Sequence, residues 1–465
     1  MENHLQRKYG LFTAICMVVG IVIGSGVFFK AQTILTKTGG DMPLGILAWI
    51  IGGAIMLVCL LTFSFMGQKY EKINGLVDYA DATVGKDYGY MVGWFSSTIY
   101  YPAMTSALAW LSARYTLVFL TSANPNFPMT IPADQGGCVI GPECMALTVF
   151  YLCATYAMNA LSPKLAGKYQ TSTTVIKLIP LGLMAVVGVI YGLTSGMLAE
   201  NFTTQAAVET VSGNPLFAAV CATAFAYEGW IIATAINAEI KDSKRNLPLA
   251  LIIGGIVIAA VYIFYYIGVA GGATNQQLID QGATVAFTNI FGGVLGNILN
   301  LFIAISCLGT TNGLMLGCSR GLYSVASRGR GPAPEVYSQV DAKTNMPNNS
   351  AVFALLVTAV WFLYFYCSNL ACMWTGPFVF DSTELPIITI YLMYLPILFQ
   401  WIRKEKDQNW LRRFVLPILA ICGSVFMVIA CIISHGWGCF WYLIVFAVIM
   451  ATGWLVDRKN FARHS

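Results

Sequence analysis

The first long apolar run of the chain contains a glycine-rich interruption that constrains the fold around it. Residues 11–29 carry no formal charge, and these 19 residues would span about 30 Å as a helix, close to the thickness of a bilayer core. Gly24, Ser25 and Gly26 lie in this run, although glycine costs a helix interior roughly 1 kcal/mol relative to alanine. Unwound backbone survives in a membrane only where protein buries it or where it lines a cavity. The run therefore predicts a broken membrane helix with a site at the break. The alternative is close helix packing through small residues, but that uses a wider spacing than Gly-x-Gly.

Eleven further apolar spans follow the first, and they predict the fold class. The chain of 465 residues is 57% hydrophobic and only 10% charged, with a mean hydropathy of +0.69, which excludes a soluble globular protein. We expect an all-α polytopic membrane protein with twelve transmembrane helices. The spans are predicted at 11–36, 43–67, 88–120, 145–161, 170–194, 215–238, 248–271, 294–322, 350–368, 378–400, 414–434 and 438–456.

The positive charges are distributed unevenly between alternate loops. Of the 26 Lys and Arg residues, 22 lie in or at the edge of the segments on one side. On the other side, the loops at 121–144, 195–214, 272–293, 369–377 and 435–437 contain none. This distribution explains the net charge of +5 without a nucleic-acid partner. By the positive-inside rule, both termini are predicted to be cytoplasmic, in a multi-pass protein of the cell inner (plasma) membrane. We also expect the first run to remain as a span, because it is longer than a cleaved leader.

Cysteine and histidine offer little sign of enzyme or metal chemistry. Most of the thirteen cysteines lie within spans, and the histidines, His4, His435 and His464, lie at ends or in loops. No metal-ligand spacing appears, so no metal site, cofactor or histidine-based enzyme is expected. Cys138 and Cys144 share one outer loop, and the sequence leaves open whether they form a disulfide.

A second interruption occurs in the sixth span, where Glu228 and Gly229 follow FAY at positions 225–227. Spans one and six are five apart, so equivalent helices would run in opposite directions. We therefore expect a single transport domain over residues 1–465, with inverted repeats at 11–194 and 215–400 and two peripheral helices at 414–456. Paired breaks in inverted halves are typical of the midplane site of a secondary transporter. Free N–H groups there would attract a carboxylate and free carbonyls an ammonium, which together fit an amino acid.

Three polar positions within or beside spans extend this hypothesis. Lys177 lies nine residues beyond Lys168, about 13 Å into the bilayer, and a charge at that depth is a functional hypothesis. The alternative is a neutral or interhelically paired structural lysine. Asn312 in the eighth span has two interpretations, facing the site or joining helices. Asp381 and Glu384 lie near the outer end of the tenth span, where a vestibule position is expected.

The chain resembles the amino acid-polyamine-organocation superfamily, and within it the L-type amino acid transporter branch with its bacterial serine/threonine and alanine/serine/cysteine exchangers. The resemblance covers nearly the whole chain and rests on IGSGVF in span one, IKLIP in span five, FAYEGW in span six, KRNLP after it, and GTTNG through SRG in span eight. It implies a LeuT-type 5+5 inverted repeat with broken helices 1 and 6, plus two helices.

The resemblance also implies roles for particular residues. Backbone amides around Ser25 and Gly26 would hold the substrate carboxylate, Phe225 would gate the outer side, and Lys177 matches a family lysine that takes the place of a sodium ion. The carbonyl groups implied to hold the substrate amine belong to Val22, Phe225, Ala226 and Glu228. The full set of candidate substrate-binding residues is Val22, Gly24, Ser25, Gly26, Phe225, Ala226, Glu228, Gly229 and Asn312.

One departure from the family pattern affects the expected function. Many eukaryotic relatives have glycine where this chain has Glu228, whose side chain could contact substrate, pair with Lys177 or titrate. The leading hypothesis is sodium-independent exchange of small neutral L-amino acids by alternating access. The alternatives are a proton-coupled symporter and, from another class, an amino acid sensor without turnover. The expected partners are amino acids, the lipid bilayer and a second copy of the chain as a homodimer. No ancillary glycoprotein is expected, because the termini are short.

Overall fold

The computed structural model describes residues 7, 9–24, 26–70, 75–206 and 214–464 of the chain. Within these ranges, twelve helical segments are long and apolar enough to cross a membrane, which confirms the predicted number. These segments are Leu11–Lys37, Met42–Lys69, Lys86–Ala123, Gly137–Leu161, Pro163–Ser195, Pro215–Thr234, Ser243–Gly272, Gly293–Ala326, Asn348–Leu370, Leu385–Lys404, Leu411–His435 and Trp437–Arg458.

Several spans consist of more than one helix, because breaks and π-helical turns divide them. The first half of the chain contains α1 Leu11–Val22, α2 Gly26–Lys37, α3 Met42–Lys69, α4 Gly75–Thr83, α5 Lys86–Phe95, α6 Tyr101–Ala123, α7 Gly137–Ile140, α8 Pro142–Leu161, α9 Pro163–Leu183, α10 Val189–Ser195 and α11 Met197–Thr203. The second half contains α12 Pro215–Tyr227, the 3-10 helix η4 Trp230–Glu239, α13 Ser243–Gly272, α14 Asn275–Gln281, α15 Ala283–Phe291, α16 Gly293–Ala326, α17 Pro334–Tyr337, α18 Asn348–Tyr364, α19 Leu385–Lys404, α20 Leu416–His435 and α21 Trp437–His464.

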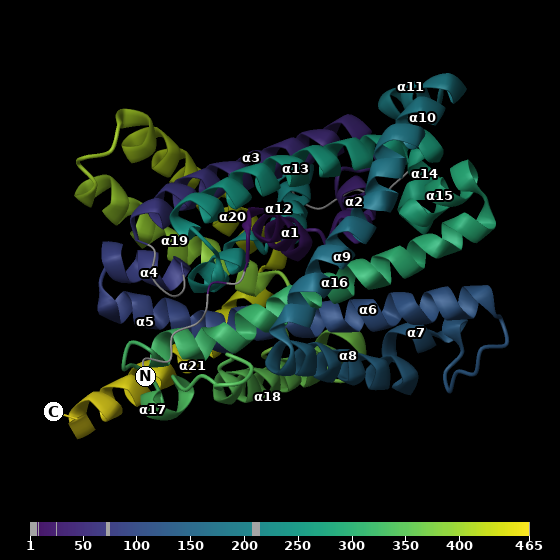
Figure 1. Cartoon of the computed structure of the whole chain (residues 1–465). Helices are drawn as coiled ribbons and strands as arrows, with labels where there is room; N and C mark the ends of the chain where they lie inside the picture. Colours follow the sequence, from purple (N-terminus) through teal and green to yellow (C-terminus); the bar gives the residue numbers. More distant parts are fainter. Residues whose placement is uncertain (1–6, 8, 25, 71–74, 207–213, 465) are drawn as a thin grey trace.

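The long helices form one bundle with short helices at its two ends (Figure 1). Helices α4 and α17 and the end of α21 lie at the left end of Figure 1, whereas α11, α14 and α15 lie at the right end. The short helices at the left end belong to segments that the charge distribution assigns to the cytoplasm. Those at the right end belong to segments assigned to the outside. The connections therefore alternate between two ends, as a multi-pass bundle requires.

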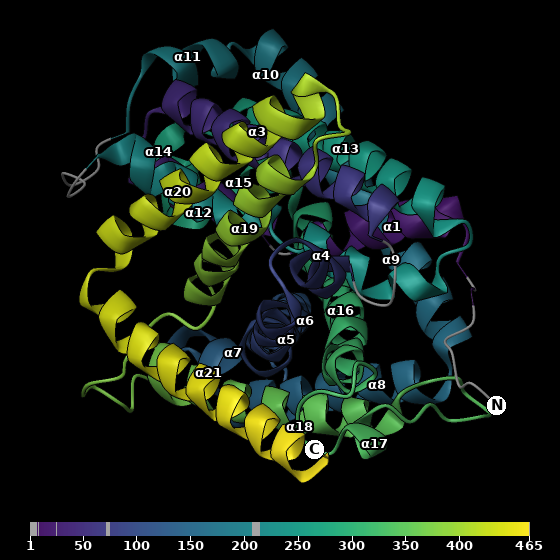
Figure 2. The same cartoon turned by 90° about the vertical axis from the view of Figure 1, so that its left-hand side faces the viewer.

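The core of the bundle surrounds the two short central helices α1 and α12. Helix α1 packs against α9, α13 and α16, while α12 packs against α2, α3 and α20. Figure 2 views the bundle along its length, with α21 at the edge. Helix α20 lies further in, against α3, α12 and α19. The two interrupted spans are therefore buried among other helices, which is where unwound backbone can be satisfied.

Candidate functional site

The first apolar span is broken where its glycines predict. Helix α1 ends at Val22, Ile23 adopts an extended conformation, and α2 begins at Gly26. Ser25 lies outside the described residues, so its predicted contact with substrate stays a prediction. An added Cβ at Gly26 would lie 2.7 Å from the Cα of Ala226 on α12. Only glycine permits this approach, which brings the two broken spans together.

The sixth span is broken at the second predicted position. Helix α12 ends at Tyr227, Glu228 is extended, and Gly229 has a φ of +106° before η4 begins. That φ value is readily accessible to glycine but strains residues with a Cβ. An added Cβ at Gly229 would also approach Cγ2 of Ile21 to 3.0 Å. Both breaks are therefore set by local sequence, and each is packed against the other span.

A small buried cavity of about 20 Å³ lies between the two breaks. It has room for about one water molecule, so an amino acid can enter only if the lining side chains move. The lining residues are Ile21, Val22, Gly24, Gly26, Tyr100, Met104, Leu108, Phe225, Glu228, Gly229, Ile232, Thr310 and Leu314. Six of the candidate site residues thus share one cavity, and the remaining lining side chains are mostly apolar.

Lys177 reaches the first break from α9 and is fully buried. Its Nζ donates to the carbonyl oxygens of Gly20 at 2.8 Å and Ile23 at 2.5 Å, and to Oγ1 of Thr310 at 3.3 Å. An ammonium group has three protons, so these three acceptors satisfy it. Lys177 therefore binds the carbonyl end of α1. It does not pair with Glu228, although such a pair was one of the three alternatives that the sequence left open for Glu228.

Hydroxyl groups on α16 complete the binding of the first break. Thr310 Oγ1 lies 3.1 Å from the Gly20 carbonyl oxygen and 3.2 Å from that of Ile23. The hydroxyl oxygen of Ser306 lies 3.3 Å from the carbonyl oxygen of Ile23 and 3.2 Å from that of Gly24, so its one proton can be donated to either. The sequence analysis did not identify Ser306 or Thr310 as site residues. Their position in the eighth span beside Asn312 was the available signal, since hydroxyl side chains commonly satisfy backbone groups in membranes.

Glu228 lines the cavity, and its two carboxylate oxygens differ in their contacts with the described residues. Its Oε1 accepts a hydrogen bond from the hydroxyl of Tyr100 in the third span. Its Oε2 is buried and has no hydrogen-bond partner among the residues that the structure describes. A carboxylate oxygen in this position can accept a hydrogen bond from a ligand or hold a proton.

Tyr262 of α13 is a third residue at the breaks, after Ser306 and Thr310, that was not predicted from the sequence. Its hydroxyl lies 3.1 Å from the carbonyl oxygen of Val22 and 3.0 Å from that of Ala226. These are two of the carbonyl groups expected to hold a substrate amine. A hydroxyl has one proton and so can donate to only one of them at a time. The carbonyl oxygen that Tyr262 does not bind therefore remains available to an ammonium, as does the second lone pair of the one that it binds.

Two candidate residues do not line the cavity. Ala226 lies beneath Gly26 and meets the site through its backbone. The side-chain amide of Asn312 accepts from Nδ2 of Asn159 on α8 at 2.9 Å and donates to Oε1 of Gln170 on α9 at 3.0 Å. Of the two interpretations of Asn312, the structure therefore supports the joining of helices and not a place among the cavity-lining residues.

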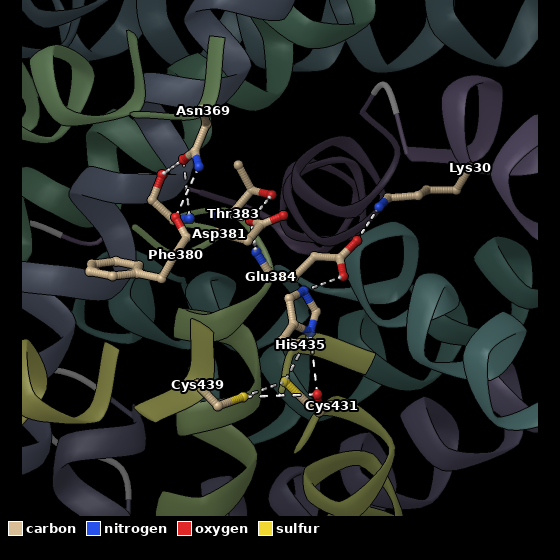
Figure 3. A network of polar contacts seen from close by, with 10 residues as sticks. Lys30, Asn369, Phe380, Asp381, Thr383, Glu384, Cys431, His435 and Cys439 are labelled. Atoms are coloured by element: carbon tan, nitrogen blue, oxygen red, sulfur yellow. Dashed lines mark hydrogen bonds and ion pairs between the residues drawn. The ribbon is translucent and has the colours of Figure 1, made fainter. Parts of the chain in front are cut away.

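Polar contacts join the surrounding helices toward the α14 end of the bundle. Lys30 of α2 forms a buried ion pair with Glu384, immediately before α19, and its Nζ lies 5.2 Å from the ring centre of Phe225. Nε2 of His435 lies 3.3 Å from the second oxygen of Glu384. Figure 3 shows Glu384 between Lys30 and His435. A vestibule position was predicted for Glu384 rather than a deep one, and in this network the side chain is buried.

A different set of contacts joins the helices at the opposite end. Tyr9 N–H donates to the carbonyl oxygen of Glu239 at 3.0 Å, and Lys241 N–H donates to that of Tyr9 at 2.8 Å, so the segment before α1 pairs with the end of η4. Arg320 of α16 donates from Nε to Oε1 of Glu239 at 2.7 Å, and both side chains are buried. The two broken spans are therefore tied to neighbouring helices at both ends. Cys138 and Cys144, whose pairing the sequence left open, are free thiols in this structure.

Comparisons with known proteins agree with this geometry. The family model for amino acid permeases matches residues 9–452. The chain is 28% identical to the serine/threonine exchanger SteT of Bacillus subtilis (strain 168), with 94% of each protein covered. It is 25% identical to the human b(0,+)-type amino acid transporter 1, over 95% of this chain and 86% of that protein.

Other relatives match a smaller part of their own length, and one solved structure shares the fold. The large neutral amino acids transporter small subunit 2 of Rattus norvegicus is 26% identical over 76% of this chain, but only 64% of that protein is spanned. A crystal structure of MhsT in complex with L-phenylalanine aligns with a TM-score of 0.63, covering 92% of this chain and 99% of the other, at 13% identity. The fold is therefore the LeuT-type fold of that transporter. The chain belongs to the amino acid permease family and is a multi-pass membrane protein of amino acid transport.

Proposed function

We propose that this protein exchanges small neutral L-amino acids across a membrane by alternating access, without sodium. The observation that carries the proposal is the ammonium of Lys177, which donates to the carbonyl groups of Gly20 and Ile23 at the end of α1. Carbonyl oxygens at a helix C-terminus form a natural cation site, because the helix dipole is negative there. With a protein cation already bound to these carbonyls, a sodium ion has no role in organising the break.

The walls of the cavity support a neutral substrate of modest size. Gly26 begins α2, and the first N–H groups of a helix attract a carboxylate. The carbonyl groups of Val22 and Ala226 lie where an ammonium would complete the recognition of an amino acid backbone. The side chain would then meet Met104, Leu108 and other apolar residues. Among the lining residues Glu228 bears the one formal charge, and Tyr100 already binds it.

The wider arrangement belongs to the same proposal. Residues 11–194 and 215–400 would form the two inverted repeats of a single transport domain, with 414–456 outside the repeats. Both termini would face the cytoplasm, as the distribution of Lys and Arg favours. The inner membrane would be the site of action, and the exposed apolar surface of α21 offers a face for lipid or for a second copy of the chain.

Uptake into proteoliposomes tests the proposal. Purified protein is reconstituted into vesicles that are either empty or loaded with serine, threonine, alanine or leucine, and radiolabelled amino acid is added outside. We expect rapid uptake only into loaded vesicles, with the same rate in sodium and in choline buffers. Strong uptake into empty vesicles under a sodium gradient would contradict the proposal.

Proton-coupled symport is the second candidate, and the free oxygen of Glu228 favours it. A buried carboxylate that faces the substrate cavity could carry a proton with each amino acid. In that case empty vesicles with an acidic exterior should accumulate amino acid, and Glu228→Gln should abolish this accumulation. If a pH gradient does not drive uptake into empty vesicles, exchange is the better description.

A further inference from the structure

A cluster of metal-binding side chains lies outside the cavity, toward the α14 end of the bundle. Ligand atoms of Cys221, Glu384 and His435 lie within 4.8 Å of one another. Cys221 is on α12, Glu384 precedes α19, and His435 ends α20. Cys221 and Glu384 are buried, and His435 is mostly buried, with 15% of its side chain exposed. The sequence spacing predicted no metal site, because the three residues come from three helices distant in the chain.

The hydrogen bonds of His435 determine which ring nitrogen faces the cluster. Nδ1 lies 3.3 Å from the backbone carbonyl oxygen of Cys431, one turn earlier on α20 (Figure 3). A carbonyl oxygen can only accept, so this contact favours the tautomer that has its proton on Nδ1, which also lies 3.6 Å from Sγ of Cys431. In a neutral imidazole, Nε2 then has a free lone pair. A histidine that binds a metal through one nitrogen commonly donates its other N–H to a backbone carbonyl in this way.

Two electron-pair donors consequently face each other across a short gap. Nε2 of His435 and Oε2 of Glu384 are 3.3 Å apart, longer than the roughly 2.7–2.9 Å of a hydrogen bond between charged groups. In a tetrahedral zinc site with Zn–N and Zn–O bonds of about 2.0–2.2 Å, nitrogen and oxygen ligands lie about 3.4 Å apart. A cation must lie between the two donors, either a proton on the imidazole or a metal ion. The Cys221 thiol supplies a third electron-pair donor. A proton shared by two atoms has no use for a third donor, whereas a metal ion takes at least three ligands.

We propose that Cys221, Glu384 and His435 form a binding site for a divalent metal ion of the zinc class. Sulfur, imidazole nitrogen and carboxylate oxygen are the ligands that zinc takes in proteins, and water would occupy the fourth position. The ion replaces the second imidazole proton and the thiol proton, which pass to solvent. The net charge of the cluster with Lys30 is then unchanged. The other oxygen of Glu384 keeps its ion pair with Lys30.

A metal at this position would connect α12 to α19 and α20. These helices adjoin the outer ends of the two broken spans, where Lys30 of α2 lies over Phe225. The bound ion would therefore hold this end of the bundle together more strongly than the Lys30–Glu384 pair alone. The site itself does not depend on which amino acid is transported or on how transport is coupled.

Cobalt spectroscopy on the purified full chain tests the proposal. Co²⁺ is titrated under reducing conditions, and absorption is recorded in the visible and near-ultraviolet. We expect one Co²⁺ per chain, visible bands typical of tetrahedral cobalt, and a thiolate-to-cobalt charge-transfer band, all removed by equimolar Zn²⁺. A wild-type protein without the charge-transfer band would overturn the proposal.

Variants assign the ligands. Cys221→Ser should lose the charge-transfer band, and His435→Gln and Glu384→Gln should each weaken Co²⁺ binding by at least about tenfold. Cys422→Ser is the matched control, because Cys422 is an exposed thiol on the same helix as His435; its spectrum should equal that of wild type. A band that persists in Cys221→Ser, or binding unchanged in His435→Gln, would refute the assignment. Size-exclusion profiles identify any variant that misfolds. The proposal is then judged on the cobalt spectra of the wild-type protein and of the variants that fold.

Discussion

Two opposite charges are buried beside the two helix breaks, and their surroundings differ. Lys177 has three acceptors for its three protons, contributed by the end of α1 and by Thr310. Glu228 accepts a hydrogen bond from the hydroxyl of Tyr100, and its second oxygen has no hydrogen-bond partner within the described part of the chain. A fully satisfied buried charge fixes the geometry of its neighbours, whereas an incompletely satisfied one can gain a partner. From this difference we propose that Lys177 supports the first break and that Glu228 contacts whatever occupies the cavity.

The same difference extends to the residues around each charge. The carbonyl groups near Lys177 also accept from Ser306 and Thr310 on α16, so helices α1, α9 and α16 share one polar network. Glu228 instead lies among mostly apolar cavity residues and accepts a hydrogen bond from Tyr100. Disruption of the first network should therefore change the position of α1, while changes at Glu228 should act more locally.

The largest effect is expected from Lys177→Ala. The substitution removes hydrogen bonds from a charged donor, each worth about 1.5–3 kcal/mol. Because these bonds connect α9 to α1, their loss should shift the balance between outward-open and inward-open states. We expect the exchange rate to fall by more than about tenfold, and the difference in affinity between the two membrane faces to change. Exchange and affinity are measured in oriented vesicles.

Lys168→Ala is the control for Lys177→Ala, because Lys168 is an exposed lysine on the same helix. It should behave as wild type. Wild-type exchange with unchanged affinities on both faces in Lys177→Ala would make Lys177 a structural lysine and refute its role as a sodium substitute.

The next largest effect is expected from Gly26→Ala or the larger Gly26→Leu, which test the contact between the two breaks. A Cβ at this position would lie 2.7 Å from the Cα of Ala226 and would separate α2 from α12. We expect loss of amino acid binding in equilibrium measurements with a labelled neutral substrate. Gly182→Ala is the control, since nothing lies within 4 Å of a Cβ added there. Wild-type affinity in both Gly26 variants would argue against the carboxylate site at the start of α2.

A smaller effect is expected at the second charge, from Glu228→Gln. Glutamine keeps the shape of the side chain and can still accept a hydrogen bond from Tyr100. If the protein is an exchanger, amino acid exchange should persist with affinity changed by a few-fold, and its dependence on pH should weaken. The double-mutant cycle with Tyr100→Phe measures the coupling of the two side chains. An abolished exchange reaction in correctly folded Glu228→Gln would mean that the negative charge itself is required.

The smallest effect on transport is expected from Asn312→Ala. Its amide joins α16 to α8 and α9, away from the cavity lining. Loss of these bonds should lower thermal stability, by about 1–3 kcal/mol if the partner groups stay buried and unpaired. Substrate affinity of the folded protein should not change, which separates this residue from Gly26. If Asn312→Ala instead lowered substrate affinity and left thermal stability unchanged, Asn312 would have to be assigned to the substrate-binding site.

The sequence by itself determined the features that depend on local chemistry. The twelve spans follow from apolar length, because every transmembrane helix must match the same hydrocarbon thickness. The breaks at Gly24–Gly26 and at Glu228–Gly229 follow from residues that are poor in a helix and tolerate unusual backbone. The depth of Lys177 along its span also follows from residue counting. In each case, the evidence lies within a few neighbouring residues.

Only the tertiary structure decided which side chains meet across helices. Lys177 binds backbone carbonyls and Thr310 instead of Glu228, and Tyr262 lies between the two breaks. Asn312 joins helices, although the same sequence was compatible with a place at the site. Periodicity identifies the span on which a polar side chain lies, but its partner depends on how helices distant in the chain pack and rotate. The meeting of Cys221, Glu384 and His435 has the same origin.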